Sequence, residues 1–212
     1  VYLHYVLDLW FEKCIKKQLY GEAYLVRFAD DFLIMFQYER DAQRVYEAII
    51  KRMELFGLEL SKEKTRILPF GRYSVSRETF DFLGFTHFNS KTRKGYYTVG
   101  HKISRKKKKQ FKSNLKKWVK KNRDKQFDEF MKKLNKKLTG SFNYYSLSGM
   151  IREVRNLWNH AQYVTFKWLN RRSQRRSFKL ERFYEIWNDL IVHPYIHVDI
   201  WSGDKVIYNK NV

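Results

Sequence analysis

Residues 24–36 read YLVRFADDFLIMF, and the fold of the first half of the chain depends on how this stretch is interpreted. Apolar, β-prone side chains stand on both sides of two adjacent acidic residues, Asp30 and Asp31. This pattern is typical of a β-hairpin with the two carboxylates at its tip. A turn needs only one Asp, and neighbouring anions repel each other. A divalent cation would remove the repulsion, and carboxylate oxygens are hard ligands that suit Mg²⁺. The alternative is an ordinary polar turn.

The composition is that of a globular protein. The chain has 212 residues, of which 43% are hydrophobic and 18% aromatic, so it can bury a core. Its single cysteine, Cys14, excludes an internal disulfide framework and a thiolate zinc cluster and suits a reducing compartment. The sequence contains neither an apolar run long enough to span a bilayer nor a signal-peptide pattern. We therefore expect a cytoplasmic protein with no membrane contact.

The positive charge is concentrated in one segment. The formal net charge is +22, and residues 101–180 contain 25 Lys and Arg against 4 Asp and Glu. The rest of the chain contains 19 against 18. A polyanionic partner, bound through phosphate neutralisation and counterion release, is the leading explanation. A solvated basic face is the alternative.

The hydrophobic periodicity predicts an α+β chain whose character changes near residue 100. The hairpin covers residues 23–38, and further short strands are expected at residues 58–60, 65–70, 80–88 and 95–99. Helices are expected at residues 2–17, 41–56, 104–122, 127–138, 151–169 and 181–190, and Gly140 is expected to stop the fourth of them. The first half is thus expected to be a mixed sheet with helices on it, and the second a small helical bundle.

Four segments together resemble one family of enzymes. Phe28-Ala29-Asp30-Asp31 matches the aromatic-Ala-Asp-Asp signature of reverse transcriptases. GLELSKEKT at residues 57–65 is similar to the next block of that family, and FLGF at residues 82–85 is similar to its primer-grip block. LNRRSQRR at residues 169–176 lies in a basic segment that resembles the thumb, or maturase domain, of bacterial group II intron reverse transcriptases. The resemblance covers roughly residues 1–195.

The resemblance implies part of a right-hand polymerase. Residues 1–100 would be the C-terminal part of the palm, an antiparallel sheet with helices. Residues 101–180 would be the basic helical thumb or maturase domain, and residues 181–212 a C-terminal helix and tail. The implied activity is RNA-directed DNA synthesis for a group II intron in a bacterial cytoplasm, together with binding of the intron RNA to assist splicing. The implied cofactor is Mg²⁺, and the implied partners are intron RNA, an RNA template, an RNA–DNA hybrid and dNTPs.

The same resemblance implies roles for individual residues. Asp30 would be a direct Mg²⁺ ligand, and Asp31 would support it in metal binding and catalysis. Lys64 would lie near the triphosphate as a proton donor to the leaving pyrophosphate, with a plain surface lysine as the alternative. The primer strand would be held by Phe82, Leu83, Gly84 and Phe85, although core packing is equally compatible with Phe82 and Phe85.

The basic half offers candidate contacts to RNA. The residues expected to bind RNA are Lys106, Lys107, Lys108, Lys109, Lys112, Lys116, Arg171, Arg172, Arg175 and Arg176. Tyr144 and Tyr145 are candidates for stacking on unpaired bases, whereas Trp158 is expected in the core.

Two alternatives stay open beside the polymerase. One is a non-catalytic RNA-binding maturase in which the hairpin serves as scaffold, and the paired carboxylates Asp30 and Asp31 argue against it. The other is a non-intron reverse transcriptase of the retron or defence type, against which the Arg-rich thumb argues. The family also has a palm aspartate, fingers and a Gly-rich block that would precede Val1, so we expect this chain by itself to bind RNA without polymerising. The sequence leaves the oligomeric state open.

Overall fold

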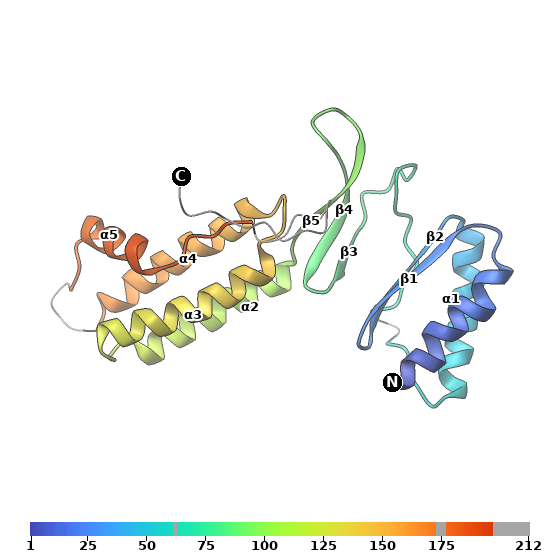
Figure 1. Cartoon of the computed structure of the whole chain (residues 1–212), viewed down its shortest axis with the longest axis horizontal. Helices are drawn as coiled ribbons and strands as arrows, with labels where there is room; N and C mark the ends of the chain where they lie inside the picture. Colours follow the sequence, from blue (N-terminus) through green and yellow to red (C-terminus); the bar gives the residue numbers. More distant parts are fainter. Residues whose placement is uncertain (62, 173–176, 197–212) are drawn as a thin grey trace. The chain divides into compact units, whose positions relative to one another are not determined.

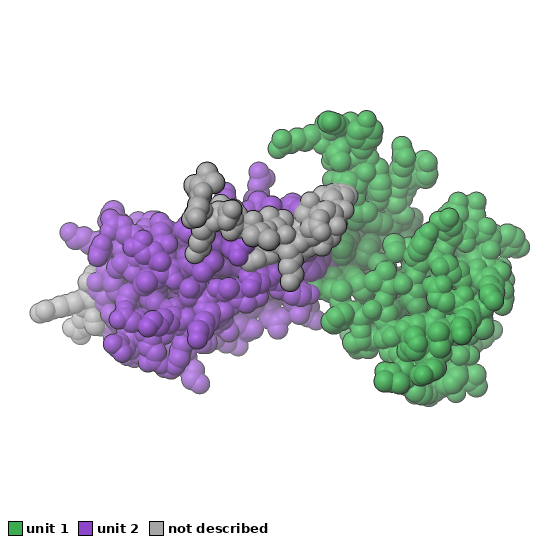
Figure 2. All heavy atoms as spheres, viewed as in Figure 1, with its two compact units in different colours: residues 1–83, 87–100 green, residues 84–86, 101–212 purple. Residues whose placement is uncertain are grey.

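The computed structural model describes residues 1–61, 63–172 and 177–196, and the chain divides into two compact units (Figures 1 and 2). Unit 1 consists of residues 1–83 and 87–100, and unit 2 consists of residues 84–86 and the chain from residue 101 onward. The described residues contain helices and two small sheets, one of two strands and one of three. The expected α+β class is therefore confirmed.

Unit 1 begins with a helix that covers one face of the hairpin. The chain is helical from residue 2 to residue 18 and includes two π-helical segments, η1 (His4–Asp8) and η2 (Phe11–Ile15), and a final 3-10 turn, η3 (Lys16–Gln18). Strands β1 (Ala23–Phe28) and β2 (Asp31–Phe36) then form an antiparallel pair, followed by α1 (Glu39–Leu55). The first helix and α1 lie on the same side of the hairpin (Figure 1). Their shared core consists of Val6, Leu7, Phe11, Ala23, Val45, Ile49 and Met53.

The three-stranded sheet corrects the strand prediction. Strands β3 (Thr79–Phe82), β4 (Phe85–Lys91) and β5 (Tyr97–Ile103) are neighbours in that order. The single strand expected at residues 80–88 is wrong, because a two-residue turn at Leu83 and Gly84 divides it into two strands. Both turn residues have positive φ, +49° and +83°, which is the signature of a type I′ hairpin turn.

The strands expected at residues 58–60 and 65–70 are also wrong, since the backbone there is irregular. The residues are β-prone, but strand structure requires a neighbouring strand to receive the backbone hydrogen bonds. This segment is held by other contacts instead. The Arg66 guanidinium donates to the Thr79 carbonyl at 2.7 Å, and the Phe70 ring packs edge-on against Phe80 with 5.0 Å between ring centroids.

Unit 2 is a helical bundle built on a central helix. It contains α2 (Arg105–Asn122), α3 (Phe127–Tyr145), α4 (Ile151–Leu169) and α5 (Leu180–Leu190). Helix α4 packs against the other three helices, and its buried residues include Trp158, as expected. The largest fully buried side chains of this core include Trp187, Phe130, Phe142, Phe183, Leu115, Leu134 and Leu138. In the described part of the chain, none of the helices combines the length and the apolar character needed to cross a membrane.

Helix α3 continues past the residue that was expected to end it. The prediction that Gly140 stops this helix is wrong, because α3 runs on to Tyr145. The continuation buries Phe142 in the bundle core, and that burial outweighs the low helix propensity of one glycine. Nothing lies within 4 Å of the position that a Cβ atom at Gly140 would occupy.

We therefore expect Gly140→Ala to stabilise unit 2. Alanine favours the helix over glycine by about 0.5–1 kcal/mol, and the added methyl meets no neighbour. Gly149→Ala is the matched contrast, because Gly149 has φ of +82° and an L side chain there costs about 1–2 kcal/mol. Thermal unfolding of the two variants should show the melting temperature rising for the first and falling for the second. A lower melting temperature for Gly140→Ala would contradict the account of α3.

Candidate active-site turn and nucleic-acid interface

The two carboxylates lie at the tip of the β1–β2 hairpin, as predicted. Phe28 and Asp31 form the last cross-strand pair, so Ala29 and Asp30 are the two residues of the turn. Ala29 has φ of +55°, a left-handed conformation that non-glycine residues seldom adopt. Strained backbone of this kind persists only where the surrounding structure holds it in place.

Arg27 provides that restraint. Its Nε and Nη2 atoms donate to the two carboxylate oxygens of Asp8 on the first helix, each at 2.6 Å. Its Nη1 atom donates to the carbonyl oxygen of Ala29 at 2.7 Å. One guanidinium therefore ties the turn to the helix that lies against the hairpin. Arginine makes these bonds from three nitrogens of one planar fork, whereas the three donors of lysine all start from a single nitrogen and do not reproduce this spacing.

The ion pair also shifts the titration of its members. The hydrogen bond from Arg27 is the main reason that the pKa of Asp8 lies below its ordinary value of 3.8. The same bond raises the pKa of Arg27. Both side chains are about three-quarters buried, with relative exposures of 25% and 21%, so solvent weakens the pair less than it would on the open surface.

Asp8 and Arg27 were absent from the residues singled out in the sequence. The sequence does contain a signal for Arg27, because strand alternation places Ala23, Leu25 and Arg27 on the inward face of β1. A charged residue on a face that packs against helices requires a partner. The sequence does not say which carboxylate supplies it.

Asp30 and Asp31 are both exposed. Neither carboxylate forms a hydrogen bond or an ion pair with any residue in the described ranges, which distinguishes them from Asp8. They provide two adjacent oxygen donors, and Mg²⁺ is commonly held by one or two carboxylates together with water and substrate phosphates. Within the described residues, no group of three or more His, Cys, Asp or Glu side chains lies close enough to hold a metal ion. The pair fits Mg²⁺ as part of a ligand set.

Lys64 lies in a turn of unit 1 and is exposed. The backbone N–H groups of Lys64 and Thr65 both donate to the carbonyl of Ser61, at 3.0 and 2.9 Å. Among the described residues, no hydrogen bond or ion pair joins the Lys64 ammonium to Asp30 or Asp31. The structure therefore does not bring the expected proton donor and the carboxylates into contact.

The residues expected to hold a primer strand form the β3–β4 turn. Phe82 ends β3, Leu83 and Gly84 form the turn, and Phe85 begins β4. The Gly84 carbonyl accepts a hydrogen bond from the Ser104 backbone N–H at 2.9 Å. A Cβ atom at Gly84 would lie 3.5 Å from Cγ of Lys107, so this turn lies directly against the start of α2.

Helix α2 carries the first group of expected RNA contacts. The Ser104 hydroxyl caps the helix by accepting from the Lys107 backbone N–H, and the first turn contains no acidic residue. Cations at a helix N-terminus oppose the helix dipole, so this arrangement costs free energy in the isolated protein. Lys108 differs from its neighbours, because it forms an ion pair with Glu153 of α4 at 2.5 Å. The exposed members of the group are Lys106, Lys107, Lys109, Lys112 and Lys116.

A second basic group surrounds Trp168 at the end of α4. The charged groups of Lys120, Arg123 and Arg171 lie 5.5, 5.6 and 5.7 Å from the centre of the indole ring. Arg123 also donates to the Arg171 carbonyl at 3.1 Å, which joins the ends of α2 and α4. Arg123 was missed in the sequence, where a single arginine after a lysine-rich helix carries no distinguishing signal. Arg172 lies over Phe178 at 5.9 Å, whereas Arg175 and Arg176 lie outside the described residues.

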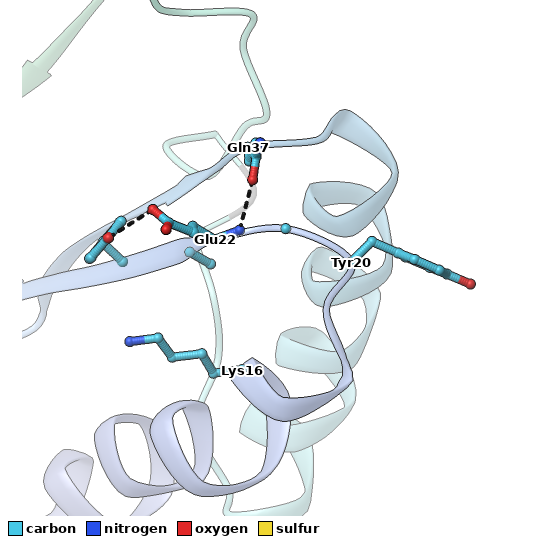
Figure 3. A pocket seen from close by; sticks show the side chains of 7 residues that line it. Lys16, Tyr20, Glu22 and Gln37 are labelled. Atoms are coloured by element: carbon cyan, nitrogen blue, oxygen red, sulfur yellow. Dashed lines mark hydrogen bonds between the residues drawn. The ribbon is translucent and has the colours of Figure 1, made fainter.

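A hollow of about 420 Å³ lies at the opposite end of the hairpin from the carboxylates (Figure 3). The residues that line it contact one another: the Gln37 side chain accepts a hydrogen bond from the Glu22 backbone N–H at 3.1 Å, and the Tyr24 hydroxyl donates to the Glu22 carboxylate at 2.9 Å. Lys16 lies over the Tyr24 ring at 5.4 Å. Because β1 and β2 are six residues long, this hollow is roughly 17 Å from the turn and does not belong to it.

Two family models match different parts of the chain. Residues 1–87 match the model described as reverse transcriptase (RNA-dependent DNA polymerase). Residues 108–185 match the model described as the group II intron, maturase-specific domain. A comparison with curated proteins finds no match. The first match contains the β1–β2 turn, and the second contains most of the basic helical bundle.

The Asp8–Arg27 pair should make unit 1 sensitive to acid. Folding lowers the pKa of Asp8. The contribution of the Asp8 carboxylate to the stability of unit 1 is therefore fully present above the ordinary pKa of the carboxyl group and is lost as the pH falls through the lowered value. We expect Asp8→Asn or Arg27→Lys to lower the free energy of opening of β1 and β2 by about 1–3 kcal/mol at neutral pH. The deficit of Asp8→Asn relative to the parent should shrink between about pH 5 and pH 3.

Amide hydrogen exchange of β1 and β2, corrected for the intrinsic exchange rate at each pH, measures this free energy. Glu12→Gln is the control, because Glu12 lies one turn after Asp8 but forms its ion pair with Lys16 instead of Arg27. A deficit that does not change with pH would contradict the role given to the Asp8 carboxylate.

Proposed function

Because the chain belongs to the group II intron reverse transcriptase/maturase family, we propose that it contributes to RNA-directed DNA synthesis and to binding of the intron RNA during splicing. The observation that carries the catalytic part is the restrained turn with two exposed, adjacent carboxylates. The match to a maturase-specific domain supports an intron protein rather than a retron or defence-type reverse transcriptase. The paired anions favour the enzyme over a non-catalytic maturase, because a scaffold does not require them.

In this proposal, residues 1–100 are the C-terminal part of a polymerase palm, residues 101–180 are the thumb, and residues 181–212 are a C-terminal helix and tail. Two separate compact units and a helical second unit are compatible with such a division. The type I′ turn at Leu83 and Gly84 would present Phe82–Phe85 to the primer strand. A tight turn allows the backbone to approach a bound strand closely.

The carboxylates of Asp30 and Asp31 would hold Mg²⁺. When bound, Mg²⁺ supplies activation of the primer 3′-hydroxyl and neutralisation of charge on the dNTP triphosphate. Arg27 would keep the turn in the strained conformation through the Ala29 carbonyl, so that both carboxylates are oriented before the ion arrives. Lys64 would hold a proton on Nζ for the leaving pyrophosphate.

The exposed cations of unit 2 would bind RNA or an RNA–DNA hybrid through phosphates. A-form duplexes are recognised mainly by shape and backbone, so no base-reading side chains are required. Lys120, Arg123 and Arg171 lie around one indole ring, where the exposed carboxylate of Asp124, 3.7 Å from Arg123, is one anion against three cations. A phosphate at this place would relieve the remaining repulsion.

Metal-directed cleavage tests the carboxylate site. Fe²⁺ in place of Mg²⁺, with ascorbate and peroxide, generates hydroxyl radicals that cut the backbone next to a bound ion. We expect cleavage near the β1–β2 turn that excess Mg²⁺ suppresses and that Asp30→Asn and Asp31→Asn reduce. Asp189→Asn on α5 is the control and should cleave like the parent protein. Cleavage that persists at the turn in both turn variants would contradict the metal site.

Charge-removal variants test the RNA surface. We expect Lys120→Gln combined with Arg171→Gln to weaken binding of a structured intron RNA and to lower the slope of log K against log salt by about 1–2. The matched control, Lys132→Gln with Lys136→Gln on α3, removes the same charge from exposed positions elsewhere in unit 2. Equal losses of affinity for both pairs would show that net charge, rather than the Trp168 group, determines binding.

A further inference from the structure

Three aromatic rings meet where β4 begins and α3 ends, all within unit 2. Phe85 and Tyr144 are stacked, with 5.6 Å between ring centroids and 24° between ring planes. The Tyr145 ring meets both of them edge-on, at 5.6 Å from Phe85 and 4.9 Å from Tyr144. Offset-stacked and edge-to-face contacts of this kind are the favoured geometries of aromatic pairs.

The three rings differ in exposure. Tyr144 is 53% exposed, whereas Phe85 and Tyr145 are partly buried and pack against the core of the bundle. The Tyr144 ring is therefore supported by Phe85 and Tyr145 while about half of its surface faces solvent. A ring that is already held in one orientation loses little conformational entropy when another flat group stacks on it.

The surroundings of this aromatic group are positively charged. Atoms of the Lys107 side chain lie 3.5 and 3.6 Å from the position of a Cβ at Gly84, and the Tyr145 hydroxyl lies 3.8 Å from the same point. Lys107 thus packs beside the same turn as the aromatic rings. Arg105 and Lys106 are exposed next to it in sequence, and the first turn of α2 contains no acidic residue.

We propose that Tyr144, supported by Phe85, is a stacking platform for an unpaired base of a nucleic-acid strand, and that Lys107 contacts a phosphate of the same strand. A flat ring next to cations is complementary to a nucleotide, which combines a flat base with an anionic backbone. Stacking accepts any base, because every base has a π-face. This inference rests on the proposed function only because it takes nucleic acid as the partner. The proposed function requires contacts to phosphates alone, and the inference adds a contact to a base.

The test compares two strands that carry the same phosphates. One probe is a short oligothymidine strand, and the other is an abasic strand of the same length. We expect Tyr144→Leu to lower the affinity for oligothymidine by about 5- to 150-fold and to leave the affinity for the abasic strand unchanged. Tyr144→Phe keeps the ring and should bind both strands like the parent protein. Tyr184→Leu, at a 41% exposed tyrosine of α5, is the matched control and should also bind like the parent.

Photo-crosslinking of the unmodified protein provides a second measurement that needs no variant. A strand containing 5-iodouracil should crosslink to Tyr144, and mass spectrometry of the peptides locates the attachment. A crosslink elsewhere, or equal losses on both strands for Tyr144→Leu, would overturn the platform. Parent protein that binds the two strands with equal affinity would overturn the platform and leave the proposed phosphate contacts standing. If the parent protein binds neither strand, both the stacking platform and the proposed phosphate contacts are wrong.

Discussion

The three hydrogen bonds of the Arg27 guanidinium are the interaction on which the candidate active site depends. They connect the first helix, through Asp8, to the carbonyl of Ala29 in the β1–β2 turn. A two-residue turn places Asp30 and Asp31 next to each other, but it requires Ala29 to adopt a positive φ. The cost of that conformation is of the same order as the energy of a charge-assisted hydrogen bond, about 1–3 kcal/mol. Without Arg27, the turn could relax and the carboxylates would lose their common orientation.

In unit 2, the residues that provide stability differ from those proposed to bind nucleic acid. Its stability comes from an apolar core along α4, to which the other three helices contribute large side chains such as Phe130, Phe183 and Trp187. Because the apolar face of α2 is buried in that core, the remaining faces of the helix can carry solvated lysines. The cations do not act as one uniform surface. Lys108 is engaged by Glu153, Lys107 packs beside Gly84, and Lys120 shares the Trp168 ring with two arginines. The distribution of partners, rather than the count of lysines, identifies the places where phosphates would be bound.

Particular residues show how far the sequence predicts the structure. The hairpin, α1 and the four helices of unit 2 follow from apolar periodicity, because each buries one face on a neighbouring element. Leu58–Leu60 and Thr65–Phe70 failed as strands because a local pattern cannot supply the neighbouring strand that pairing requires. The division of residues 80–88 into two strands depended on Leu83 adopting a left-handed conformation, which no leucine signals. Gly140 remained helical because Phe142 reaches the core one turn later.

The sequence by itself predicted the resemblance to reverse transcriptases and group II intron maturases, the α+β class, the hairpin with its two acidic residues and the location of the positive charge. These features depend on local patterns and on residue chemistry, which are present in the chain before it folds. Only the tertiary structure decided which cations are paired, that Asp8 restrains Arg27, and that Tyr144 stacks on Phe85 beside Lys107. Such contacts join residues that are about 20 to 60 positions apart, as Phe85 and Tyr144 are, and their partners are selected by the packing of whole elements rather than by any neighbouring residue.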